Sequence, residues 1–464
     1  MSRLKRLWSG LRGSFWFIPS VIVAVSIVLA VASIAMDSSG SKPWMARWPR
    51  LFGSGAAGAR GMLSTIAGSM MTVVGVTFSM TLVTLALASS QYTSRILRNF
   101  MRDRVTQLVL GIFAGIFTYC LIVLRTIRGG NQEDFIPSLA VTFGVVLAIG
   151  GIGVLIFFIH HIASSIQAST IIAAVASETM VAVDRLFPEE LGQAPSEEAE
   201  NQSQFLPERS WQHVPARGDG YIQSVDDAAL LRVAREHKTV VRMECGIGDF
   251  VVHDAALVSI ALETPPGEGI IGQLQAAYGI DRHRTVEQDA AFGIRQIVDM
   301  ALRALSPGVN DTTTAVMCVD YLTAILARLA SRPIPSSYRY EQGHLRVITI
   351  GPTFVSLVAE SFDQIRGSAR GNVAVLLKML AAIQTIASLT DRPSRRRVLV
   401  EHVQEIAELA DRTIDSPRDR ARFEGGLASV RKALETGSAS MRPRQAGWHV
   451  PELHLGDSGR QEAP

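Results

Sequence analysis

The densest group of side chains that could bind a small molecule lies between residues 284 and 314. Asp289 and Arg295 come first, and Ser306, Asn310 and Asp311 surround a Ser-Pro-Gly turn. Carboxylate, guanidinium, amide and hydroxyl groups of this kind can converge on a polar ligand. The same residue types also cap helices, and capping accounts for most of them without any ligand. A ligand-binding corner is therefore the alternative to simple capping.

An enzyme built around Asp289, Asn310 and Asp311 is the least supported interpretation. The chain offers no nucleophile beside a base, no set of metal ligands and no glycine-rich phosphate loop. We expect no catalytic residue, no metal and no cofactor.

Two helices must position these polar groups. Thr285 and Gln288 form a capping-box pattern that predicts the start of the first helix. The turn at 306–308 ends it, and Asn310 or Asp311 caps the second.

A second group of polar side chains lies within an apolar segment. Gly68, Thr72, Gly75 and Ser79 recur at spacings of four, three and four, which places them on one helical face. Such small residues let helices approach closely in lipid, so this face indicates helix packing. A wet pore lining is the alternative interpretation.

Histidines and cysteines give weaker signals. His160 and His161 point about 100° apart on a helix, so within one chain they would need partners from elsewhere to bind metal or sense pH. Anchoring at the membrane interface is the preferred interpretation for both. Cys245 and His253 could face each other across a hairpin, but two ligands are too few for a metal site. The three cysteines are scattered, which favours a reducing, cytoplasmic soluble part.

Four long apolar segments carry the strongest signal in the chain. Residues 15–36, 62–88, 105–124 and 136–158 hold no Asp, Glu, Lys or Arg in their central parts. A bilayer core of about 30 Å needs roughly 20 helical residues, and each segment meets this length. The sequence predicts an integral, multi-pass membrane protein. The lack of ionisable residues within the spans disfavours a proton- or ion-coupled pump.

Basic residues near the span ends give the orientation. With the N-terminus inside, the inner side carries eight Lys and Arg residues and the outer side six. The inner set includes Arg95, Arg98 and Arg102, which share one face of an amphipathic segment suited to contact with anionic lipid. We expect both termini in the cytoplasm. The net charge of only +3 gives no indication of nucleic-acid binding.

Composition shifts divide the chain into six parts. A cytoplasmic N-terminus (1–14) precedes the four-helix transmembrane domain (15–161). A helical stalk and an acidic linker (162–204) lead to a small α+β subdomain (205–265), a helical cytoplasmic domain (266–436) and a disordered tail (437–464). The predicted fold class is an α-helical membrane protein with four transmembrane helices, followed by a cytoplasmic α+β and then mainly helical domain.

Within the α+β subdomain, local patterns predict individual elements. Residues 220–225 alternate like a strand, and an Asp-capped helix follows at 226–236. Strands at 239–245 and 250–260 are predicted to form a hairpin through the turn at 246–249.

Several dispersed motifs resemble a known family. They are Ala-Ser-Ser-Gln-Tyr at 88–92 with the arginines up to 104, Phe-Phe-Ile-His-His at 157–161, Gly-Tyr-Ile-Gln at 220–223, Gly-Asp-Phe-Val at 248–251 and Ala-Leu-Ser-Pro-Gly-Val-Asn-Asp at 304–311. The chain resembles, up to about residue 435, a bacterial family of predicted membrane proteins classified as domain of unknown function 2254. Thr312 departs from the Pro that usually follows Asn-Asp in that family. The resemblance implies a four-helix inner-membrane topology with a cytoplasmic domain, and it implies no activity.

Two functional hypotheses follow. The first is an oligomeric passive channel in the bacterial inner membrane with a cytoplasmic regulatory domain, lined by the face that carries Gly68, Thr72, Gly75 and Ser79. The second is a non-conducting sensor or scaffold whose cytoplasmic domain binds an unknown ligand or partner. In both hypotheses the partners are the lipid bilayer and further copies of the chain.

Overall fold

The computed structural model describes residues 16–38, 55–91, 103–128, 135–187 and 210–435. The chain divides into two compact units. One comprises residues 1–182 and 283–321, and the other comprises residues 183–282 and 322–464.

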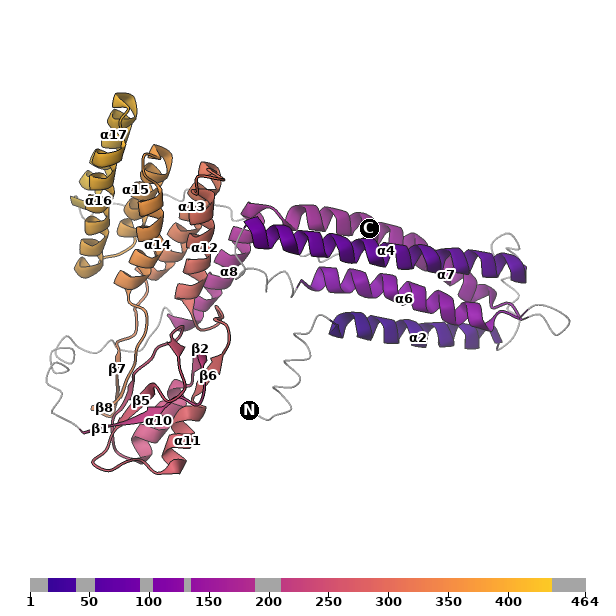
Figure 1. The fold of residues 1–464 in the computed structure, drawn as a ribbon, viewed down its shortest axis with the longest axis horizontal. Coiled ribbons are helices and arrows are strands. Elements are labelled where there is room, and N and C mark those ends of the chain that lie inside the picture. Colours follow the sequence, from indigo (N-terminus) through magenta and orange to yellow (C-terminus); the bar gives the residue numbers. More distant parts are fainter. Residues whose placement is uncertain (1–15, 39–54, 92–102, 129–134, 188–209, 436–464) are drawn as a thin grey trace, which may run out of the picture. The chain divides into compact units, whose positions relative to one another are not determined.

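The four predicted apolar segments all form long helices in the first unit (Figure 1). They are α2 (Phe17–Ser38), α4 (Ala56–Gln91), α6 (Arg104–Thr126) and α7 (Ser138–Ser165). With 36 residues, α4 is the longest. Its length of about 54 Å exceeds the roughly 30 Å of a bilayer core.

A fifth helix, α13 (Thr312–Ala330), is also long and apolar enough to cross a membrane. Among the described residues five helices therefore meet this criterion, and the predicted count of four is not confirmed. The apolar stretch of α13 is the least hydrophobic of the five, and Asp320 lies near the middle of this helix.

The four helices pack around α6. Of its apolar stretch 56% is buried, against 11–17% for α2, α4 and α7. Gly111 and Gly115 allow this packing, because a Cβ at Gly111 would lie 2.6 Å from the Ile22 side chain and 3.0 Å from the Pro19 Cα. Small residues four apart let helices approach closely in this way. The interior is filled by large side chains such as Phe113, Tyr119 and Phe158.

Two polar contacts tie α2 to the start of α7. The Asp37 carboxylate accepts hydrogen bonds from the N–H groups of Leu139 (3.3 Å) and Ala140 (3.0 Å). It thereby satisfies free donors at a helix start where the preceding Pro137 offers no side-chain cap. The Tyr119 hydroxyl lies 3.0 Å from the Ser33 hydroxyl and donates to the carbonyl of Ala140 (2.9 Å).

The predicted stalk helix exists but is interrupted. The α7 helix ends at Ser165, and α8 (Ala168–Leu186) begins three residues later. The Gln167 N–H turns back to the Ser164 carbonyl (3.3 Å), while the Gln167 carbonyl accepts from Thr170 N–H (3.0 Å) and so starts the next helix. Further along, α12 (Ala290–Ala304) crosses α8 at Gly293, where a Cβ would lie 2.9 Å from the Thr179 Cβ.

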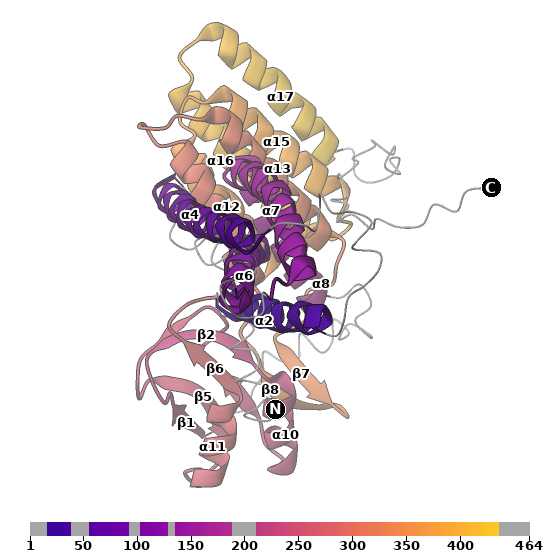
Figure 2. The same ribbon diagram turned by 90° about the vertical axis from the view of Figure 1, so that its right-hand side faces the viewer.

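Two small sheets form the first part of the second unit. The larger has the strand order β1-β5-β3-β8-β7 and the smaller the order β4-β2-β6. The bounds are β1 (Trp211–Pro215), β2 (Gly220–Val225), β3 (Val241–Met243), β4 (Phe250–Val251), β5 (Ala256–Ala261), β6 (Tyr278–Asp281), β7 (Tyr338–Glu341) and β8 (His344–Ile348). Two helices, α10 (Asp227–Glu236) and α11 (Glu268–Ala276), accompany them (Figure 2). Their core contains Ile222, Leu230, Val258 and Ile260.

Strand β2 and the Asp226 cap of α10 confirm the predictions for residues 220–236. The predicted pairing of strands 239–245 and 250–260 is confirmed in part, because β3 pairs antiparallel with β5. The predicted tight turn at 246–249 is wrong, because these residues lead the chain into the other sheet, where β4 pairs with β2 before β5 begins. Cys245 and His253 therefore do not face each other across a hairpin.

A hairpin was missed in the region predicted to be helical. Strands β7 and β8 pair antiparallel, and β8 adds parallel to β3. The connecting Gln342 and Gly343 both have positive φ (50° and 77°). A turn with two positive φ values has the twist that joins two antiparallel strands.

Four helices complete the second unit: α14 (Phe354–Ser368), α15 (Val373–Ser388), α16 (Pro393–Thr413) and α17 (Pro417–Glu435). Both views show α15, α16 and α17 side by side (Figures 1 and 2).

Two buried arginines join helix ends within this unit. Arg332 donates to the Phe187 carbonyl beyond the end of α8 (3.0 Å) and pairs with Asp184 (2.7 Å). Arg395 in turn donates to the carbonyls of Leu329 (3.0 Å), Ala330 (2.9 Å) and Arg332 (2.9 Å) at the end of α13. The terminal carbonyls of both helices thus receive charged donors.

Candidate functional site

The predicted small-residue face of α4 is not covered by the other described residues of the first unit. Gly68, Thr72, Gly75 and Ser79 are all exposed. Among the described residues, nothing lies within 4 Å of a Cβ built at Gly68 or Gly75. The opposite face of α4 packs inward through Ala59, Leu63, Ala67 and Met70.

This outward face continues toward the start of the helix. Gly61 and Thr65 are also exposed, so glycine recurs every seven residues at 61, 68 and 75, and a hydroxyl recurs at 65, 72 and 79. We call these six residues the α4 stripe. The hydroxyls of Thr65 and Thr72 donate to the carbonyls of Gly61 (2.8 Å) and Gly68 (3.0 Å). Their donors are satisfied inside the helix, and their oxygen atoms stay free to accept.

An open groove of about 420 Å³ borders the α4 stripe. Its walls come from α4 and α7, and all but one of the lining side chains are apolar. The lining residues are Gly61, Met62, Thr65, Ile66, Val145, Ala148, Ile149 and Ile152.

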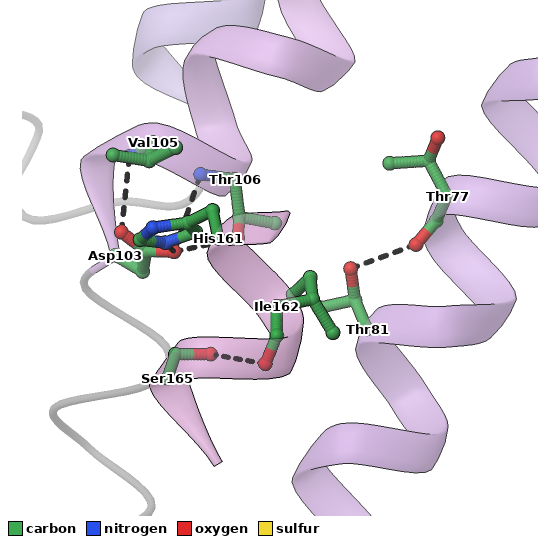
Figure 3. A network of polar contacts seen from close by, with 8 residues as sticks. All are labelled: Thr77, Thr81, Asp103, Val105, Thr106, His161, Ile162 and Ser165. Atoms are coloured by element: carbon green, nitrogen blue, oxygen red, sulfur yellow. Dashed lines mark hydrogen bonds and ion pairs between the residues drawn. The ribbon is translucent and has the colours of Figure 1, made fainter. Parts of the chain in front are cut away.

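His161 has a partner that the sequence analysis did not assign. Its Nε2 lies 2.9 Å from the Asp103 carboxylate, and each side chain is 25% exposed (Figure 3). Asp103 also caps α6 by accepting from the N–H of Val105 (3.0 Å) and the hydroxyl of Thr106 (2.6 Å). An Asp shortly before an apolar helix is a cap signal, but only the packing of α7 against α6 brings His161 to it.

The surroundings of Asp103 set its charge state. Burial raises the pKa of its carboxyl, while hydrogen bonds from His161, Thr106 and Val105 lower it, and the net pKa lies below the ordinary 3.8. The carboxylate therefore keeps its negative charge at neutral pH. It can hold the His161 ring in place through the 2.9 Å contact with Nε2.

The structure does not gather the predicted ligand-binding corner into one site. Asp289 caps α12 by accepting from Phe292 N–H (2.9 Å), and it also pairs with Arg284 (2.7 Å). The predicted capping box at Thr285 is therefore wrong, because the helix begins five residues later. Asp311 caps α13 by accepting from the N–H of Thr314 (3.0 Å). The 15 residues of α12, about 22 Å of helix, separate these two carboxylates.

The other members of the predicted corner have local roles. Arg295 lies 3.6 Å from Asp299 on the same helix. The Ser306 hydroxyl donates to the Arg303 carbonyl (2.6 Å), and Asn310 adopts a left-handed backbone with φ of 48°. These contacts belong to the end of α12 and to the turn that follows it. Arg95, Arg98 and Arg102 lie outside the described residues.

A further cluster in the second unit escaped sequence analysis. Asp363 and Arg366 on α14 meet His402 and Glu405 on α16. Each pair shares a helix face through its spacing of three residues. The pairs are far apart in the sequence, so no local pattern connects them.

These features define a mostly helical membrane protein with several apolar helices and an additional α+β part. The profile of the family described as "Predicted membrane protein (DUF2254)" matches residues 12–385, and the chain belongs to this family. It is similar to the uncharacterised proteins Rv1290c of Mycobacterium tuberculosis and Mb1321c of Mycobacterium bovis. Each is 33% identical over 447 residues, which cover 94% of this chain and 83% of the relative. No solved structure matches the chain.

Proposed function

We propose that the chain forms a homo-oligomer through the α4 stripe and that the subunits enclose a passive pathway for ions along α4. The observation that carries the proposal is the seven-residue repeat of glycine and hydroxyl residues on an exposed helix face. A seven-residue repeat keeps one face of a helix toward a partner over several turns. Small residues in that repeat allow close approach in lipid.

The pathway is proposed between subunits and not within one. The interior of the described four-helix bundle is filled by buried aromatic and aliphatic side chains. Hydroxyl oxygens at Thr65 and Thr72 face outward with free acceptor capacity. Oxygen ligands without a fixed charge can replace part of the hydration shell of a cation.

The proposed location is the inner membrane of a bacterium, with α2, α4, α6 and α7 spanning it and both termini in the cytoplasm. The slight excess of Lys and Arg on the inner side supports this orientation. The proposal leaves α13 outside the membrane, since Asp320 would be costly at the bilayer centre. The second unit would then regulate the pathway.

The second candidate is a non-conducting sensor or scaffold. In that case the α4 stripe only holds copies together, and the cluster at α14 and α16 is the ligand-responsive part. The two candidates share the oligomer and differ in conduction.

The experiment is ion conductance of the full chain reconstituted in liposomes. Thr72→Val and Ser79→Ala remove the hydroxyl groups without adding bulk to the α4 stripe, and they are expected to abolish conductance while folding and oligomer size stay unchanged. Val28→Leu adds bulk at an exposed position of α2 and is expected to conduct like the wild type. Silence of the wild type across ions, voltages and membrane tension would refute the channel and leave the sensor.

A further inference from the structure

The cluster at α14 and α16 brings three metal-ligating side chains together. The His402 Nδ1 lies 3.5 Å from an Asp363 carboxylate oxygen and 3.5 Å from a Glu405 carboxylate oxygen. The three ligand atoms all lie within 4.8 Å of one another. Two ligands bound about 2.0–2.1 Å from one ion at near-tetrahedral angles are separated by roughly 3.3–3.5 Å. The two distances from His402 therefore match those expected around a single small cation.

The same three atoms lack hydrogen bonds. The Asp363 Oδ1, His402 Nδ1 and Glu405 Oε2 are buried and have no hydrogen-bond partner among the described residues. The His402 side chain is only 9% exposed, so bulk solvent has little access to it. Buried polar atoms without hydrogen bonds cost free energy, and a bound ion is one of the recognised reasons why a native structure keeps them.

We propose that Asp363, His402 and Glu405 form a binding site for a divalent transition-metal ion of the Zn²⁺ type. One imidazole and two carboxylates suit such an ion, whereas Mg²⁺ and Ca²⁺ prefer an all-oxygen shell. Three protein ligands leave one position for water or a further ligand. The site lies within the second unit, and it stands independently of conduction along α4.

Arg366 competes with the metal. Its guanidinium lies 3.1 Å from Glu405 and 3.5 Å from Asp363, yet neither carboxylate oxygen gains a properly directed hydrogen bond. One guanidinium cannot neutralise two carboxylates, so one negative charge remains for a cation. The Arg366 side chain is 24% exposed and can turn outward when an ion enters. Binding would thus replace the Arg366 guanidinium by a metal ion as the cation that neutralises the two carboxylates.

The route into the site is set by the carboxylates. Asp363 and Glu405 are 44% and 45% exposed, although their ligating atoms are buried. The cluster is therefore closed on the His402 side and reachable from the carboxylate side. The Phe362 ring packs edge-on against the His402 ring, with centroids 6.4 Å apart, and limits its rotation.

The test is titration of the full chain in detergent with Zn²⁺ alone by calorimetry, and with Co²⁺ alone by visible absorption. We expect one saturable site and d–d bands typical of low-coordinate Co²⁺. His402→Gln and Asp363→Asn should weaken binding by at least the roughly 10–100-fold that loss of an outer-shell partner costs. The matched control His344→Gln changes an exposed histidine of the same unit and should bind like the wild type.

Arg366→Gln separates the metal site from a purely structural ion-pair network. Removing the competing cation should tighten Zn²⁺ binding if the site holds metal. A network that only stabilises the helices would bind no metal in this variant and would simply melt earlier. The proposal is overturned if wild type and Arg366→Gln both fail to bind, or if His402→Gln and Asp363→Asn bind as the wild type does. Asp363→Asn, at a half-exposed position, keeps the test decisive if His402→Gln fails to fold.

Discussion

Replacing Arg395 by Met tests whether buried arginines hold the helix ends of the second unit together. The Arg395 side chain is buried, and its guanidinium donates to three carbonyls at the end of α13. Burial, with a smaller contribution from Arg392, lowers the pKa of Arg395 to about 10. The group is therefore still cationic at neutral pH, and its donors are charged.

The magnitude follows from these three bonds. A hydrogen bond from a charged donor contributes about 1.5–3 kcal/mol net, but the three act on one helix end and are not additive. Met retains the apolar stem and its packing, so we expect a loss of about 3 kcal/mol. For a unit of this size that corresponds to a fall in Tm of roughly 6–12 °C. Arg395→Lys keeps the charge but loses the planar fork, and should cost about half as much.

The assay is thermal unfolding of the full chain in detergent, read by circular dichroism. Arg397→Met removes an exposed arginine two residues away and should change the free energy of unfolding by less than about 0.5 kcal/mol. If Arg395→Met has the same Tm as Arg397→Met, the reasoning is refuted, because the three carbonyls would then need no charged donor.

Two further predictions concern the first unit. Gly293→Ala should destabilise it by about 1–3 kcal/mol, since the new methyl would meet the Thr179 Cβ at 2.9 Å. The control is Gly425→Ala, at a helical position where the described structure leaves open space; it should be neutral or slightly stabilising. An equal Tm for the two variants would contradict the close crossing of α8 and α12. The second prediction concerns stability in acid. The pKa of Asp103 in the folded protein lies below the ordinary value of 3.8. The stabilisation of the folded state by this carboxylate is therefore present above pH 3.8 and is lost as the pH falls through the folded pKa. Wild type should therefore lose Tm below about pH 4 relative to Asp103→Asn, and parallel pH curves for the two proteins would exclude this role.

Local patterns in the sequence were sufficient for the elements whose signals lie within a few residues. The four apolar segments predicted α2, α4, α6 and α7, because spanning a bilayer depends on length and hydropathy alone. Asp226 likewise predicted the start of α10, since a cap bonds to a donor three residues away.

The tertiary structure decided which helices and strands that are far apart in the sequence pack against each other. The α4 stripe suits both an inner and an outer face, and only the packing of α4 against α6 and α7 turned it outward. Residues 246–249 were compatible with a tight turn, but the chain passes there into the second sheet before β5 returns to pair with β3. The contacts of His161 with Asp103 and of His402 with Asp363 each join residues that lie far apart in the sequence. Periodicity places a side chain on a face of its own helix, whereas its partner is set by the summed packing of the whole unit.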